Sequence, residues 1–94
     1  MKIRWTRLAS RDLQAIQDHV AQDNPLAAGR LTAAIQERVQ QLRDHPEIGR
    51  PGRVTGTREL VITGTPYIAP YRVKDQHVEI LALYHSARRW PEHF

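Results

Sequence analysis

A histidine and three arginines in the second half of the sequence have the types and spacing that phosphate chemistry requires. His85 follows the apolar segment 78–84 and precedes Arg88 by three residues, while Arg58 and Arg72 lie on two neighbouring strand-like segments. Imidazole can give or take a proton near neutral pH, and guanidinium groups beside it can hold the phosphate on which the transfer acts. The pattern therefore predicts chemistry or phosphate binding around these four residues.

The same residues also have structural interpretations. Arg58 starts a strand face that continues with Leu60 and Ile62, where an arginine commonly stays at the rim as an ion-pair partner or an anion contact. Arg72 fits a solvated strand charge, and a lone histidine such as His85 is more often structural than catalytic. If Arg58, Arg72 and His85 form one site, we expect their side-chain ends to converge on one face of the sheet, near the loop 47–57.

The end of the chain adds two binding candidates. Arg89 can contact phosphate beside Arg88, and Trp90 can stack on a base or hold the C-terminus against the sheet. The remaining histidines lack metal-ligand spacing, so no metal is expected; they are His19, His45, His77 and His93. The glycines at positions 49 and 52 are not part of a phosphate-binding loop with its lysine, and no cofactor is expected.

Hydrophobic periodicity predicts the elements that would position these residues. Residues 2–6 alternate as a short strand, and two apolar stripes at helical spacing follow, over residues 8–22 and 25–42. Asn24 is a good N-cap and Pro25 suits the first helical position, so the helices form an antiparallel hairpin. Strand-like segments 58–62, 67–73 and 78–84 follow, with a bulge or break at Pro70, which has no N–H to donate. The predicted fold is α+β: an N-terminal strand, a helical hairpin and a three-stranded antiparallel meander (β-α-α-β-β-β).

Size and composition indicate one domain that spans residues 1–94. A chain of 94 residues can close one hydrophobic core but not two. The lack of cysteine excludes thiolate catalysis and cysteine-bound zinc. No apolar run approaches the ~20 residues of a membrane span, so we expect a cytoplasmic protein without a membrane partner. The net charge of +4, carried mostly by arginine, suits an anionic partner.

An ordered series of short motifs along almost the whole chain resembles the RelE/ParE toxin superfamily. Each motif is weak alone, but their order and spacing on a β-α-α-β-β-β chain of this length are typical of the superfamily. The motifs are Asp12-Leu13-x-x-Ile16, Asn24-Pro25-x-Ala27, Leu42-x-x-x-Pro46-x-x-Gly49-Arg50-Pro51, Arg58-Glu59, Tyr71-Arg72-Val73 and Ile80-Leu81-x-x-x-His85-x-x-Arg88.

The resemblance implies the toxin of a bacterial type II toxin–antitoxin pair. Such a toxin is held inactive in a hetero-oligomer by a cognate antitoxin, which we expect to be acidic and partly disordered, and a basic toxin complements that charge. RelE-like members cut messenger RNA on the ribosome, whereas ParE-like members poison DNA gyrase, and both use one scaffold. Our first hypothesis is a ribosome-dependent mRNA endoribonuclease. The alternatives are a gyrase inhibitor without nuclease activity and an inactive, antitoxin-binding member.

The nuclease hypothesis assigns roles to individual residues by resemblance. The ribose 2′-hydroxyl would attack the adjacent phosphate and leave a 2′,3′-cyclic phosphate, which requires a base, an acid and a cation. Arg58 matches the arginine that contacts the scissile phosphate, His85 lies near a catalytic histidine of some members, and Glu47 is a further candidate base. Arg50 and Arg53 replace lysines that many members carry in this loop. The expected substrate-binding residues are Arg50, Arg53, Arg72, Arg88, Arg89 and Trp90.

Overall fold

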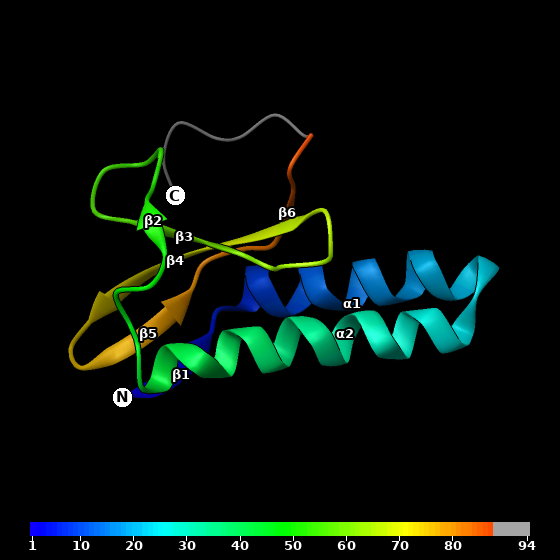
Figure 1. Cartoon of the computed structure of the whole chain (residues 1–94), viewed down its shortest axis with the longest axis horizontal. Coiled ribbons are helices and arrows are strands. Elements are labelled where there is room, and N and C mark those ends of the chain that lie inside the picture. The colour runs from blue at the N-terminus through cyan, green and yellow to red at the C-terminus, as the bar shows by residue number, and fades with distance from the viewer. Residues whose placement is uncertain (88–94) are drawn as a thin grey trace.

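In the computed structural model, which describes residues 1–87, a helical hairpin covers one face of a mixed six-stranded sheet (Figure 1). This is the predicted α+β architecture. The helices are α1 (Arg7–Asp23) and α2 (Pro25–Gln40), and the 3-10 helix η1 (Gln41–Arg43) extends α2 by one turn. The strands are β1 (Lys2–Trp5), β2 (Arg50–Pro51), β3 (Arg58–Val61), β4 (Tyr67–Lys74), β5 (His77–Ile80) and β6 (Tyr84–His85).

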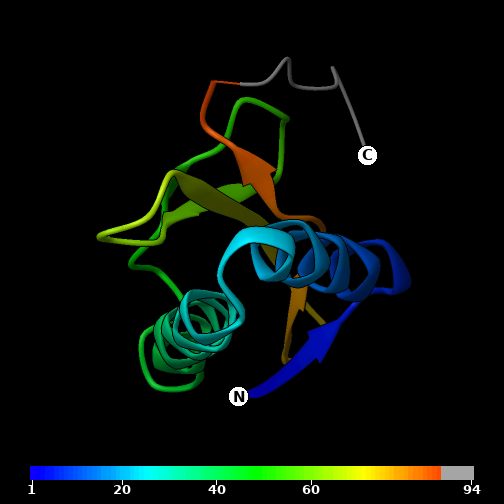
Figure 2. The same cartoon turned by 90° about the vertical axis from the view of Figure 1, so that its right-hand side faces the viewer.

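Side-chain caps define where both helices begin. The Thr6 hydroxyl accepts a hydrogen bond from the Ala9 N–H at 3.2 Å, and the Asn24 side chain accepts one from the Ala27 N–H at 3.0 Å, with Pro25 next in the chain. The two helices pack side by side, as the end-on view in Figure 2 shows, and the turn between them projects beyond the sheet in Figure 1. Neither helix is long and apolar enough to cross a membrane, within the described residues.

The predicted antiparallel meander forms the centre of the sheet. The strand order is β1-β5-β4-β3-β2, β4 is antiparallel to both β3 and β5, and β6 pairs with β4 beyond the end of β5. The N-terminal strand β1 lies at the edge, parallel to β5. The short strands β2 and β6 were not predicted as separate elements, because two residues carry no periodic signal.

Pro70 interrupts the pairing of β4 with its neighbour, as expected. The paired residues Tyr71 and Ile80 are followed by Ile68 and Tyr84, so two residues of β4 lie opposite the three-residue segment 81–83. Proline offers no N–H, but its carbonyl still accepts a hydrogen bond from the Leu81 N–H at 2.9 Å. The predicted strand 78–84 is consequently split into β5 and β6.

The hydrophobic core lies between the hairpin and one side of the sheet. Ile35, Val39 and Leu42 from the second helix and η1 are fully buried, as are Leu60 and Tyr71 from the strands. We call this the helix-facing side. Side chains alternate along a strand, so Arg72 and its neighbour across the ladder, Glu79, point to the opposite, outer side. These two sides separate the candidate residues into different environments.

Candidate functional site

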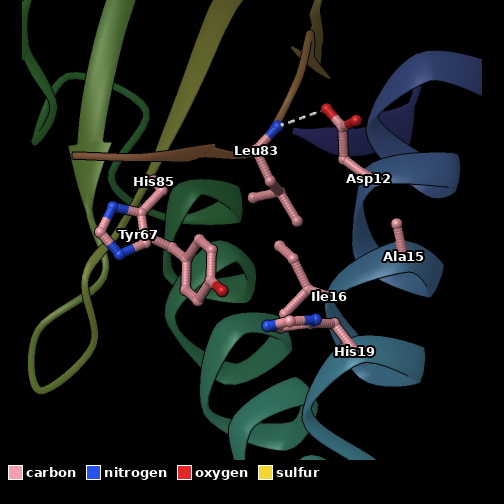
Figure 3. Close-up of a pocket in the computed structure, with 7 residues that line it drawn as sticks. All are labelled: Asp12, Ala15, Ile16, His19, Tyr67, Leu83 and His85. Atoms are coloured by element: carbon pink, nitrogen blue, oxygen red, sulfur yellow. Dashed lines mark hydrogen bonds between the residues drawn. The ribbon is translucent and has the colours of Figure 1, made fainter. Parts of the chain in front are cut away.

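His85 lines a small pocket between α1 and the end of the sheet (Figure 3). The cavity measures about 100 Å³, well below the roughly 300–1,000 Å³ typical of small-molecule sites. Its lining combines two imidazoles, a carboxylate and a phenol with apolar groups: Asp12, Ala15, Ile16, His19, Tyr67, Leu83 and His85. The pocket can therefore receive a single side chain or a small polar group, but not a whole nucleotide.

The His85 ring is fixed by two contacts within the chain. It lies opposite Tyr67 in the β4–β6 ladder, and the two rings meet edge to face with their centroids 5.6 Å apart. The Ala87 N–H donates to His85 Nδ1 at 3.1 Å. Because a backbone N–H can only donate, Nδ1 must accept, and the proton of the neutral ring lies on Nε2. This tautomer offers a donor at Nε2, whereas a general base needs a free lone pair.

Asp12 holds the interrupted strand segment against α1. Its carboxylate oxygen Oδ2 accepts a hydrogen bond from the Leu83 N–H at 2.9 Å, which replaces a ladder bond that the segment lacks. Burial raises the pKa of the neighbouring Tyr84 phenol, and the Asp12 charge adds to this effect. Asp12 and His19 were not predicted as site residues. Asp12 and His19 are seven residues apart, with Ile16 between them, so all three lie on one face of the helix. This spacing is the sequence feature that could have indicated the pocket.

Arg58 fastens the chain segment that follows α2. Its Nη1 donates to the Gly49 carbonyl at 2.9 Å and to the Glu47 carbonyl at 3.3 Å. Tyr71, its partner across the ladder, donates from its hydroxyl to the Pro46 carbonyl at 2.7 Å and accepts from the Gly49 N–H at 2.9 Å. Arg58 thus contacts neither Glu59 nor Glu79 through a hydrogen bond or ion pair within residues 1–87, and its guanidinium is used to hold backbone. Glu47 belongs to this segment, and its side chain is exposed.

The expected convergence of Arg58, Arg72 and His85 on one face was wrong. Arg58 lies opposite Tyr71 and His85 lies opposite Tyr67. At about 3.3 Å per residue these two positions are about 13 Å apart along β4. Arg58 and His85 belong to strands that pair with opposite edges of β4, although both residues lie on the helix-facing side. Arg72 points to the outer side of the sheet. The alternation and the register place the three residues in three separate environments.

A buried carboxylate binds two arginines that precede β3, Arg50 in β2 and Arg53 in the loop after it. Glu59 is 2% exposed, and its Oε1 accepts from Arg50 Nε at 3.1 Å and from Arg50 Nη2 at 3.0 Å. Its Oε2 accepts from the Arg53 backbone N–H at 2.8 Å and lies 3.7 Å from Arg53 Nε. Buried carboxylates require such partners, so this cluster ties the loop before β3 to the sheet. Both arginines remain about half exposed while neutralising Glu59.

Arg72 forms an ion pair on the outer side. Its Nε donates to Glu79 Oε1 at 2.8 Å, and Arg4 Nη1 lies 3.9 Å from Glu79 Oε2. The hydrogen bond from Arg72 lowers the pKa of Glu79, and the charges of Arg72, Lys74 and Arg4 lower it further. The predicted substrate contact at Arg72 is therefore an arginine that already has a carboxylate partner.

The sequence matches a known protein family and individual relatives. Residues 3–90 match the family described as the ParE toxin of the type II toxin–antitoxin system parDE. The chain belongs to the ParE toxin family. It is 45% identical over 91 residues to the protein named "Putative toxin Y4kP" of Sinorhizobium fredii, and the matched region covers 97% of this chain and 94% of that protein.

Two solved structures resemble this ParE-family toxin closely in fold. One is from the chromosomal ParDE system of P. aeruginosa, with a TM-score of 0.84, 36% identity and coverage of 90% of this chain and 95% of the other. The second is from the toxin–antitoxin complex RelBE2 of Mycobacterium tuberculosis, with a TM-score of 0.67, 31% identity and coverage of 89% and 95%. The relatives thus include proteins named for both branches of the superfamily.

The remaining expectations for this ParE-family toxin concern metals and the chain end. No group of three or more His, Asp or Glu side chains within residues 1–87 is arranged to hold a metal ion. Arg88, Arg89 and Trp90 lie outside the described residues, so their expected binding roles stay predictions.

Proposed function

We propose that this ParE-family toxin stops growth by binding DNA gyrase and that it does not cut messenger RNA. One observation carries the proposal: Arg58 and His85, the two residues with principal roles in the nuclease hypothesis, lie at positions about 13 Å apart along β4. Cleavage by the 2′-hydroxyl requires a base, an acid and a phosphate-binding cation to contact one phosphodiester group. The separation of these residues favours action by binding.

The local contacts of the candidate residues support the same proposal. The His85 Nδ1 lone pair accepts the Ala87 N–H, and the Arg58 guanidinium holds the Gly49 carbonyl. Arg50 and Arg53 both form ion pairs with the buried Glu59. A nuclease would need to release several of these contacts before it could engage a phosphate.

We propose in addition that a cognate antitoxin neutralises the toxin by forming a hetero-oligomer with it. Two similar structures come from toxin–antitoxin systems, and the net charge of +4 complements an acidic, partly disordered partner. Co-expression with the protein encoded by a short adjacent reading frame should restore growth and yield a complex that co-purifies with this chain. Growth arrest that persists despite co-expression would contradict this pairing.

The target is tested by inducing the full chain in cells without an antitoxin. We expect trapped gyrase–DNA cleavage complexes, together with transcripts that remain intact when their ends are mapped. Cleavage within translated messages, with gyrase complexes at the uninduced level, would contradict the proposal and favour the nuclease. Unaffected growth at full expression would favour the inactive member.

A further inference from the structure

The outer side of the sheet carries a row of cations that the proposed function does not use. In the ladder, Lys2 and Lys74 flank His77, and Arg4 and Arg72 flank Glu79. Residues paired across a ladder point to the same side, so these six side chains share one surface. We call it the basic sheet surface, and it consists of Lys2, Arg4, Arg72, Lys74, His77 and Glu79.

Positive charge dominates this surface. Four cations face a single carboxylate, that of Glu79, and both arginines approach it, Arg72 at 2.8 Å and Arg4 at 3.9 Å. Lys2 and Lys74 are exposed, and neither forms an ion pair within the described residues. The lowered pKa of Glu79, caused first by Arg72 and also by Lys74 and Arg4, is consistent with a positive local potential.

A hollow lies next to this surface, where β1 and β5 begin. It measures about 440 Å³, and Lys2, Arg43 and His77 are among the side chains that line it. The turn residue Asp75 is the acidic group that borders it. The cationic region therefore extends from the three strands β1, β5 and β4 to Arg43 of the 3-10 helix η1.

The chemistry of the surface favours one kind of polyanion. Single-stranded nucleic acids are bound by aromatic stacking platforms, but the basic sheet surface has no Phe, Tyr or Trp, and the His77 ring is tied to the Asp75 carbonyl at 2.8 Å. A disordered peptide that folds on binding must bury apolar surface to offset the entropy that it loses, and the six polar side chains of this surface offer it none. Lysines act as point charges for phosphate groups and bind them without reading sequence.

We propose that the basic sheet surface binds the phosphate backbone of duplex DNA, without sequence preference, through Lys2 and Lys74. Arg4 and Arg72 stay paired with Glu79 and contribute positive charge to the surface without contacting phosphate. Across the strands the two lysines are two sheet spacings apart, about 9.6 Å, so they can contact different phosphates. This inference goes beyond the proposed target, because it concerns binding of the toxin to DNA in the absence of gyrase.

The test measures binding of the full chain to a fluorescent 20-base-pair DNA duplex by anisotropy over a range of salt concentrations. The surface variant is Lys2→Gln with Lys74→Gln. The matched control is Arg11→Gln with Arg30→Gln, which removes the same charge from exposed positions on the helical hairpin. Each phosphate contact adds about 0.9 to the steepness with which the logarithm of the binding constant falls against the logarithm of the salt concentration. The surface variant should therefore lower this slope by about 2 and weaken binding on the order of tenfold near 0.1 M salt.

The outcomes separate this proposal from others. A large loss in the surface variant with a small loss in the control supports it. Equal losses in both variants, or no duplex binding by the unmodified chain at about 50 mM salt, would overturn it. Tighter binding of a single-stranded oligonucleotide of equal length, or binding of polyglutamate but not of the duplex, would overturn it in favour of another partner. Gyrase inhibition without duplex binding would refute this proposal alone.

Discussion

Arg58 and His85 are paired with the two opposite ends of the stretch of β4 that runs from Tyr67 to Tyr71. Arg58 is paired with Tyr71 through β3, and His85 is paired with Tyr67 through β6. Each has its own local function: Arg58 holds the segment after α2, and His85 packs against the Tyr67 ring beside a small pocket. This relationship explains why the candidate residues support binding better than catalysis.

The Glu59 cluster should be the main support of the loop before β3. Glu59→Gln removes the charge that Arg50 and Arg53 neutralise, and should lower the free energy of unfolding by about 1–3 kcal/mol, a moderate loss because both arginines are half exposed. Urea denaturation measures this, with Glu47→Gln at an exposed position as the control. An equal free energy of unfolding for both variants would contradict the role assigned to the buried carboxylate.

Two glycines should respond oppositely to the same substitution. A Cβ atom at Gly49 would lie 2.5 Å from Cε1 of the Tyr71 ring, so Gly49→Ala should destabilise the fold by about 1–3 kcal/mol. A Cβ at Gly29, inside α2, meets no atom within 4 Å, and Gly29→Ala should stabilise it by about 0.5–1 kcal/mol through helix propensity. Thermal unfolding of the two variants compares them directly. Destabilisation of similar size at both positions would contradict the packing described for Tyr71.

The Tyr71 hydroxyl should make stability sensitive to alkaline pH. Burial raises the pKa of this phenol above 10.0, although the Gly49 hydrogen bond and the Arg58 charge act in the opposite direction. The folded state then holds its proton at a pH where the unfolded state releases it. Stability from this group is therefore complete below about pH 10 and is lost as pH rises through the folded-state pKa.

Tyr71→Phe provides the comparison for this pH dependence. The variant should lose about 1–2 kcal/mol at neutral pH, because the Pro46 carbonyl and the Gly49 N–H lose their shared partner. Its stability should then decline less steeply than that of the unmodified chain above pH 10, when denaturant midpoints are measured at successive pH values. Parallel declines in the two proteins would show that Tyr71 does not cause the effect.

Local patterns in the sequence predicted the elements but not the contacts between distant residues. The cap at Asn24, the proline at position 25 and the break at Pro70 are each set by one or two residues, and all three were confirmed. The parallel pairing of β1 with β5 joins residues more than 70 positions apart, and no periodicity encodes it. Secondary-structure periodicity reports which side is apolar, but not which strand becomes the neighbour.

The candidate site shows the same limit. Strand alternation alone places Arg72 on the side of the sheet opposite Tyr71. Because Arg58 is on the same side as Tyr71, the alternation already conflicts with the expected convergence of Arg72 and Arg58. The partners of Arg50 and Arg58 depend on how the loop returns to the sheet, which short-range spacing does not determine. The pocket between Asp12 and His85 exists because α1 lies over the end of the sheet, and the sequence pattern does not indicate that position.

The central claim is tested most directly by one comparison with purified components. The full chain is added to DNA gyrase on relaxed plasmid and, in parallel, to translating ribosomes with an end-labelled message. We predict that supercoiling is inhibited and that the message remains intact. Unaffected supercoiling together with ribosome-dependent cleavage of the message, abolished by both His85→Gln and Arg58→Gln, would contradict the proposal.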